Sequence, residues 1–345
     1  MVPLSSPLKA PPPQDMQWVR VEDASAVPAC RKAVQIMAER LRFSASRIGQ
    51  LALAVTEAAS NLHKHAEQGS LLLCVNRDGQ PPGIDLVTID AGPGVRDVSA
   101  AVRDGHSTAG TLGVGLGTIR RLANFADLYS RPGRGTSLVA RFLPVLAGGT
   151  TPPDPPRPPW AGLVRPITGE TECGDAYGVA EAGGEVTAVL CDGLGHGPLA
   201  AAAAAAGVAA VLDDPAAEPA ALLERVHRRM SGTRGGAVGI VRIDGQRARF
   251  AGLGNVAASI VSGGQRKSMV SIPGIAGHQA RTVRQFEYEA PPGSALILHS
   301  DGISSRWEAA ALPGLEARDP LLIAAVLLAE AGVHRDDAGV LVLKP

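Results

Sequence analysis

The stretch Gly110-Thr111-Leu112-Gly113-Val114-Gly115-Leu116-Gly117 is a glycine-rich segment that runs into a predicted helix, residues 117–125. A glycine turn ahead of a helix exposes backbone N–H groups, and with the helix dipole these can hold phosphate groups. Taken alone the stretch is weak, because a flexible loop has the same composition. The residues on either side of it decide the question.

An ordered set of motifs surrounds the glycine-rich segment. Residues 46–66 are predicted to form a helix, because apolar residues recur at helical spacing. A predicted strand, residues 84–89, ends in Asp90-Ala91-Gly92-Pro93-Gly94, and the turn Gly133-Arg134-Gly135-Thr136 precedes another strand. The polar residues that fall within about one face of the helix are Glu57, Asn61, Lys64 and His65. A solvated polar stripe is the alternative interpretation of that face.

The set, in this order, resembles the ATP-binding domain shared by gyrase, histidine kinases and MutL, over about residues 18–144. The resemblance implies a GHKL (Bergerat) α/β sandwich that binds ATP and Mg²⁺. It assigns Mg²⁺ coordination to Asn61, the adenine amino group to Asp90 and the catalytic base to Glu57. The short domain looks like the anti-sigma and switch-protein serine kinases, and residues 104–108 favour the switch-kinase branch. The other implied ATP-pocket residues are Lys64, His65, Gly92, Gly94, Gly113, Gly115, Gly117 and Thr136.

In the second half of the chain, aspartates stand at the ends of apolar strand patterns. A single Asp-Gly is most often a turn, but the recurrence at several strand ends indicates more. Converging carboxylates repel one another unless cations neutralise them, so the pattern predicts a hard-metal centre with oxygen ligands. Two metals there would give a hydroxide that attacks phosphorus at neutral pH. The aspartates are Asp175, Asp192, Asp301, Asp336 and Asp337.

This pattern resembles the SpoIIE-type metal-dependent (PPM) serine/threonine phosphatases over about residues 162–343, and implies a β-sandwich flanked by helices. By the resemblance Asp192 bridges two Mn²⁺ or Mg²⁺ ions and the Gly193 carbonyl binds one. His196 either protonates the leaving serine oxygen or makes a structural hydrogen bond. Gly339 stands where the family usually has threonine, and this departure changes the set of side chains around Asp336. The remaining implied metal ligands are Asp175, Asp301, Asp336 and, near the phosphate, Asp337.

A proline-rich segment separates the two halves. Seven of the sixteen residues 144–159 are proline, which fits a stiff polyproline spacer. We expect a disordered leader (residues 1–14), a GHKL kinase-like domain (15–144), a linker (145–160) and a SpoIIE-type phosphatase domain (161–345). Helices and strands mix without regular alternation in both halves, so the predicted fold class is α+β with two domains.

Composition excludes several classes of protein. With 33 basic and 33 acidic side chains the net charge is zero, so we expect neither nucleic acid nor membrane as a partner. The longest apolar run, residues 199–212, is mostly alanine and is predicted to be a buried helix. The four cysteines lack the spacing of a zinc site, and no secretory signal is evident, so we expect reduced thiols in the cytoplasm.

Together the halves predict a bifunctional regulator that phosphorylates and dephosphorylates serine or threonine on STAS-domain anti-sigma-factor antagonists or stressosome-like proteins. A sigma factor is a further possible partner. The alternative is that the first domain binds ATP only to hold a sigma factor or a STAS protein, and that the phosphatase alone is an enzyme.

Overall fold

A computed structural model of the chain describes residues 8–77, 81–95, 112–144, 159–278 and 282–345. It divides into two compact units. The N-terminal unit is Pro11–Arg157, and the C-terminal unit combines Met1–Ala10 with Pro158–Pro345. The chain therefore starts in the C-terminal unit, passes through the N-terminal unit and returns.

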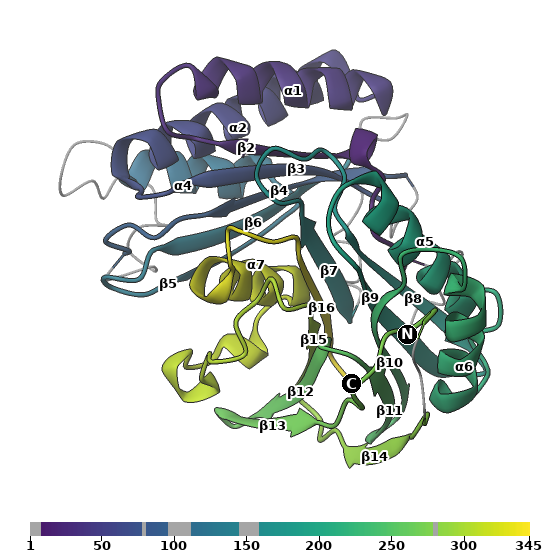
Figure 1. The fold of residues 1–345 in the computed structure, drawn as a ribbon. Helices are drawn as coiled ribbons and strands as arrows, with labels where there is room; N and C mark the ends of the chain where they lie inside the picture. The colour runs from purple at the N-terminus through teal and green to yellow at the C-terminus, as the bar shows by residue number, and fades with distance from the viewer. Residues whose placement is uncertain (1–7, 78–80, 96–111, 145–158, 279–281) are drawn as a thin grey trace. The chain divides into compact units, whose positions relative to one another are not determined.

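The N-terminal unit is an antiparallel sheet in the order β2-β3-β4-β6-β5, with helices α1, α2 and α4 on one face (Figure 1). The elements are η1 (Pro13–Asp15), β2 (Met16–Arg20), α1 (Ala26–Arg40), α2 (Ala45–His65), β3 (Ser70–Asn76), β4 (Gly83–Ile89), α4 (Leu112–Leu122), β5 (Phe125–Ser130) and β6 (Thr136–Phe142).

Helix α2 lies at the centre of this unit's core. Its N-terminus is capped by Ser44, whose hydroxyl accepts from the Arg47 N–H at 3.3 Å. The α2 residues Leu51, Ala58 and Leu62 are buried. They belong to one hydrophobic cluster with strand residues such as Leu71 and Leu86. Because this cluster covers one face of α2, the polar residues of the helix lie on the other face.

The C-terminal unit contains two sheets, in the orders β1-β8-β9-β10-β11-β14 and β13-β12-β15-β16-β7. Helices α5 and α6 pack on the first sheet and α7 on the second (Figure 1). With the N-terminal unit this confirms the predicted two-domain α+β class. The elements are β1 (Leu8–Lys9), β7 (Trp160–Arg165), β8 (Asp175–Ala182), β9 (Glu185–Gly193), α5 (Pro198–Leu212), α6 (Pro219–Met230), β10 (Gly236–Asp244), β11 (Arg247–Leu253), β12 (Ala257–Ser262), β13 (Gln265–Met269), β14 (Phe286–Glu289), β15 (Ala295–His299), η2 (Ala309–Ala311), η3 (Leu315–Ala317), α7 (Pro320–Ala331) and β16 (Ala338–Leu343).

The apolar run at residues 199–212 lies in helix α5, and Ala203, Ala204 and Val208 are buried in the core of the C-terminal unit. Within the described ranges, no helix has both the length and the apolar character needed to cross a bilayer.

Part of the expected disordered leader is a strand. Leu8 and Lys9 pair antiparallel with Val179 and Gly178 of β8, and the Ala10 N–H donates to the Tyr177 carbonyl at 3.0 Å. The edge of β8 offers unpaired backbone groups that this segment satisfies, which sequence periodicity over two residues does not reveal. Residues 1–7 lie outside the described residues.

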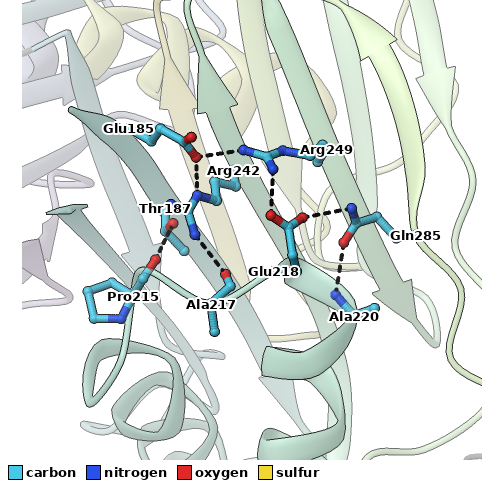
Figure 2. Close-up of polar contacts among 9 residues, drawn as sticks. All are labelled: Glu185, Thr187, Pro215, Ala217, Glu218, Ala220, Arg242, Arg249 and Gln285. Atoms are coloured by element: carbon cyan, nitrogen blue, oxygen red, sulfur yellow. Dashed lines mark hydrogen bonds and ion pairs between the residues drawn. The ribbon is translucent and has the colours of Figure 1, made fainter. Parts of the chain in front are cut away.

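A polar network on the first sheet fixes the start of α6 (Figure 2). Glu185 of β9 accepts hydrogen bonds from Arg242 of β10 and, at 2.6 Å, from Arg249 of β11. Arg249 also donates to Glu218, which precedes α6, and Arg242 donates to the Ala217 carbonyl.

Candidate functional site

The N-terminal unit contains a cavity of about 340 Å³ between α2, α4 and the ends of β4 and β6. Pockets for small ligands usually begin at about 300 Å³, so the volume suits a nucleotide-sized molecule. The cavity is lined by apolar side chains together with residues that the sequence motifs single out. The predicted site residues that line it are Asn61, Lys64, His65, Asp90, Gly94 and Thr136.

Asp90 stands at the end of β4 with its backbone and side chain held in place. Its N–H donates to the Thr136 carbonyl at 3.1 Å, and its Oδ1 accepts from the Gly92 N–H at 2.8 Å. Burial raises the pKa of Asp90, while the Gly92 and Thr136 hydrogen bonds oppose that shift. Each carboxylate oxygen has more than one lone pair, so the Asp90 carboxylate can also accept a hydrogen bond from a ligand in the cavity.

Two glycines bring the turns around Asp90 into close contact. Gly94 has φ +67° and Gly135 has φ +84°, a backbone region that other residues rarely adopt. A Cβ on Gly94 would collide with the Arg131 carbonyl, and one on Gly135 with the Asp90 carbonyl. The predicted motifs after β4 and before β6 therefore form one packed wall of the cavity.

Glu57 and Asn61 of α2 meet the glycine helix α4. A Cβ on Gly115 would lie 2.8 Å from Asn61 Nδ2 and 3.0 Å from Glu57 Oε2, so a larger residue would displace these two side chains. The Asn61 Nδ2 atom is buried and has no hydrogen-bond partner in the described structure. An orphaned buried amide beside a carboxylate fits a site for a polar ligand that brings the missing partner.

The glycine-rich segment differs from its prediction. A helix was expected from residue 117, but α4 begins at Leu112, so Gly113, Gly115 and Gly117 are helical. The approach of α4 to α2 at Gly115 explains the difference, since packing overrides the weak helix propensity of glycine. Residues 104–108, together with Gly110 and Thr111, lie outside the described residues.

Lys64 and His65 end helix α2 at the cavity. Lys64 is exposed, and His65 is half-buried. Burial lowers the pKa of His65, and the neighbouring Lys64 charge lowers it further. The shift favours the neutral imidazole, and the Lys64 ammonium supplies a positive charge at this edge of the cavity.

In the C-terminal unit, four strands bring the predicted aspartates to one place. Asp175 opens β8 and lies directly opposite Asp192 of β9 in the antiparallel pair. Asp301 follows β15, while Asp336 and Asp337 precede β16, the strand paired with β15. The strand-end pattern in the sequence thus predicted a real convergence of carboxylates.

The carboxylates raise one another's proton affinity. Burial raises the pKa of Asp192 to about 7, and repulsion from Asp301, Asp336 and Asp337 adds to the shift. Burial and Asp192 likewise raise the pKa of Asp175. A folded chain tolerates such a cluster when cations neutralise it.

The donor set fits a hard divalent cation. Asp175 Oδ1 is buried without a hydrogen-bond partner in the described structure, and its neighbours are carboxylate oxygens, the ligands that Mg²⁺ and Mn²⁺ prefer. In the described part of the chain, no three His, Cys, Asp or Glu side chains are already in metal-binding positions. The aspartates therefore converge without closing a coordination shell.

Asp337 differs from the other aspartates. It is 3% exposed, and its Oδ1 accepts from the Ile167 N–H at 2.8 Å while its Oδ2 accepts from the Gly174 N–H at 2.9 Å. Both oxygens thus join the segment ahead of β8 to the start of β16. This geometry favours a structural role over the metal-ligand role that the sequence suggested.

Ser300 and Asn255 support the aspartates, and sequence reasoning assigned them no role. Ser300 Oγ donates to Asp175 Oδ2 at 2.6 Å and accepts from the Gly339 N–H at 2.9 Å. Asn255 Nδ2 donates to Asp301 Oδ2 at 2.5 Å. A Cβ at Gly339 would lie 3.1 Å from Asp175 Oδ2, so glycine allows β16 to approach Asp175 closely. In the sequence, Ser300 is marked by its position directly before Asp301, and Asn255 has no neighbour among the predicted site residues.

His196 lies on the exposed loop after β9. Its Nδ1 is 2.9 Å from Glu170 Oε1, a partner that sequence reasoning missed. Burial and the Asp301 charge raise the pKa of Asp336, and His196 opposes that shift, so the imidazole lies near the carboxylate cluster. Glu170 orients the ring and leaves Nε2 available.

Fold and sites define a two-domain protein with an ATP-binding domain ahead of a metal-phosphatase type of domain. Residues 20–142 match the histidine kinase-like ATPase domain family, and residues 182–344 match the stage II sporulation protein E (SpoIIE) family. The chain is 30% identical over 126 residues to the serine/threonine-protein kinase RsbT of Bacillus subtilis (strain 168), covering 36% of this chain and 95% of RsbT. The chain therefore belongs to the family of RsbT-like serine kinases and carries a SpoIIE phosphatase domain fused to it.

Solved structures resemble one part of the chain. A structure from work on the bacterial stressosome, a modular system adapted to control secondary messenger signaling, has a TM-score of 0.49 and 28% identity over 54% of this chain and 98% of that one. RsbX in complex with magnesium has a TM-score of 0.48 and 21% identity over 54% and 94% of the two chains. The catalytic domain of the phosphatase PstP with two manganese ions has a TM-score of 0.41 and 17% identity over 54% and 96%.

Proposed function

We propose that this protein sets the phosphorylation state of a STAS-domain partner, an anti-sigma-factor antagonist or a stressosome-like protein, in cytoplasmic partner-switching signalling. The carrying observation is that a cavity with the kinase motifs and a cluster of strand-end carboxylates belong to one chain. Its relative RsbT is named a serine/threonine kinase, and one similar structure comes from a stressosome study. A phosphate added or removed then decides which partner binds.

In the kinase reaction, we assign adenine recognition to Asp90, whose carboxylate can accept from the exocyclic amino group. Asn61 would hold Mg²⁺, with the phosphates at α4 and near Lys64. Bound Mg²⁺ would offset charge on the phosphates. Glu57, beside Asn61 at Gly115, would take the proton of the attacking serine hydroxyl as its oxygen bonds to the γ-phosphorus and ADP leaves.

In the phosphatase reaction, we assign two Mn²⁺ or Mg²⁺ ions to Asp175, Asp192, the Gly193 carbonyl, Asp301 and Asp336. When bound, the ions would neutralise the carboxylates and make water a nucleophile at neutral pH. Ser300 and Asn255 hold two of these carboxylates in place. His196, oriented by Glu170, would donate a proton to the serine oxygen as the phosphorus–oxygen bond breaks.

The deciding experiment uses the full chain, Mn²⁺, radiolabelled ATP and candidate STAS proteins recovered by pull-down from the native cell with ATP present. Transfer of label to the partner by an Asp192→Asn chain, but not by a Glu57→Ala, Asp192→Asn chain, supports the kinase assignment. Nucleotide binding without transfer would instead favour a binding module that holds a STAS protein or a sigma factor. Release of label from a phosphorylated partner by the Glu57→Ala chain tests the phosphatase separately.

A further inference from the structure

Arg234 lies in the connection between α6 and β10, against the loop that follows Asp192. The Leu194 N–H donates to the Gly235 carbonyl at 3.0 Å, and Gly236 of β10 is the register partner of Gly193. The two residues that follow Arg234 are therefore paired with the segment that carries the proposed bridging carboxylate.

The Arg234 side chain covers this loop. A Cβ on Gly195 would lie 2.8 Å from Arg234 Nη1, and Gly195 has φ +87°. A side chain at residue 195 would displace the guanidinium as well as strain the backbone. Glycine at this position thus allows a guanidinium beside the site loop.

The connection that carries Arg234 is anchored on both sides. The Gly235 N–H donates to Thr233 Oγ1 at 3.0 Å, and Thr233 Oγ1 donates to the Met230 carbonyl at 2.7 Å. His278 Nε2 lies 3.1 Å from the Arg234 carbonyl. Such anchoring lowers the entropy that Arg234 loses when it binds a ligand.

The Arg234 guanidinium has no ion pair and no hydrogen bond within the part of the chain that the structure describes. Other arginines of the same unit are paired, for example Arg242 and Arg249 with Glu185. An exposed, unpaired guanidinium against the loop that follows Asp192 is a preorganised anion site. A phosphate dianion approaching the centre is repelled by its carboxylates, and this cation offsets that repulsion.

We propose that Arg234 binds the phosphoryl oxygens of the phosphoserine or phosphothreonine substrate. The proposal rests on the phosphatase function proposed above. Arg234 contacts the non-reacting oxygens before and during hydrolysis alike, so its main effect falls on binding of substrate and of the product phosphate.

The test compares the full chain, loaded with Mn²⁺, with Arg234→Ala and Arg234→Lys. Arg228→Ala, which removes an exposed arginine of α6 in the same unit, is the matched control. With p-nitrophenyl phosphate and a phosphoserine peptide, Arg234→Ala should raise KM about 10- to 100-fold and change kcat less than about 3-fold. The inhibition constant of inorganic phosphate should rise by the same factor, with Arg234→Lys intermediate and Arg228→Ala unchanged.

Calorimetric titration with inorganic phosphate reads the same site without turnover, and melting curves show whether each variant is folded. A folded Arg234→Ala chain with unchanged KM and phosphate affinity overturns the proposal, as does a fall in kcat alone. A wild-type chain that binds phosphate through Arg234 but releases none from substrates refutes the phosphatase and leaves the Arg234 site standing. Absence of phosphate binding to the loaded wild-type chain at millimolar concentration refutes the site.

Discussion

At the residue scale, the aspartates of the C-terminal unit were predictable because each follows or precedes an apolar strand, a pattern visible in the sequence. Ser300, Asn255, Glu170 and Arg234 were not predictable. Their roles depend on contacts between distant segments, such as the hydrogen bond from Ser300 to Asp175, which joins residues 125 positions apart. The structural role of Asp337 also required knowing that a backbone N–H group donates to each of its oxygens.

Asp192→Asn should lower phosphate release about 100-fold or more, because it removes a charge from the proposed bridging position. In chelator, the variant should melt a few degrees higher than wild type, a gain of about 1 kcal/mol, since one of several mutually repelling carboxylates is gone. Phosphate release and calorimetric melting measure the two effects. A lower melting temperature in chelator, as expected of an aspartate needed only for its turn, would contradict the assignment.

Asp90→Asn should weaken ATP binding about 10-fold or more, because the amide offers a donor where the adenine amino group also donates. Asn61→Ala should weaken binding only when Mg²⁺ is present, and Glu57→Ala should spare binding but abolish transfer. Titration calorimetry of the full chain with a non-hydrolysable ATP analogue, with and without Mg²⁺, measures these effects. Failure of the folded wild-type chain to bind the analogue would refute the nucleotide pocket.

At the element scale, most helices and strands followed from apolar periodicity, and the exceptions have identifiable causes. Helix α4 was predicted too short because its glycines disfavour a helix by roughly 1 kcal/mol each, a cost that contact with α2 offsets. Strand β1 was missed because a two-residue strand carries no period and depends on the edge of β8.

The network of Figure 2 should be a stability element of the C-terminal unit. Glu185→Ala leaves Arg242, which is 8% exposed, without its carboxylate and should cost about 3 kcal/mol of unfolding free energy. Asp213→Ala, which removes the exposed partner of Arg229, is the control and should change stability by less than about 0.5 kcal/mol. Urea unfolding of both variants measures the difference. Equal values would show that the network is a surface feature without energetic weight.

At the scale of the whole molecule, one chain holds two proposed sites of opposite effect. Given ATP and Mn²⁺, the wild-type chain should keep a STAS partner at a steady partial phosphorylation. Asp192→Asn should drive the partner toward full phosphorylation, and Glu57→Ala toward none, because each change removes one of two opposing fluxes. Phosphosite mapping by mass spectrometry follows the outcome. If the two activities mark different residues or different proteins, the shared-substrate hypothesis fails while both enzymes stand.

The pairing of Leu8 and Lys9 with β8 has a practical consequence for dividing the molecule. Because the first strand of the C-terminal unit precedes the whole N-terminal unit, the polypeptide has the layout of an inserted domain, and a single cut in the proline-rich segment does not yield two complete halves. A fragment that starts at Pro158 would leave the β8 edge open to intermolecular strand pairing and aggregation. A better-behaved phosphatase fragment would join residues 1–10 to Pro158 through a short flexible linker, so that the missing strand returns to its own sheet.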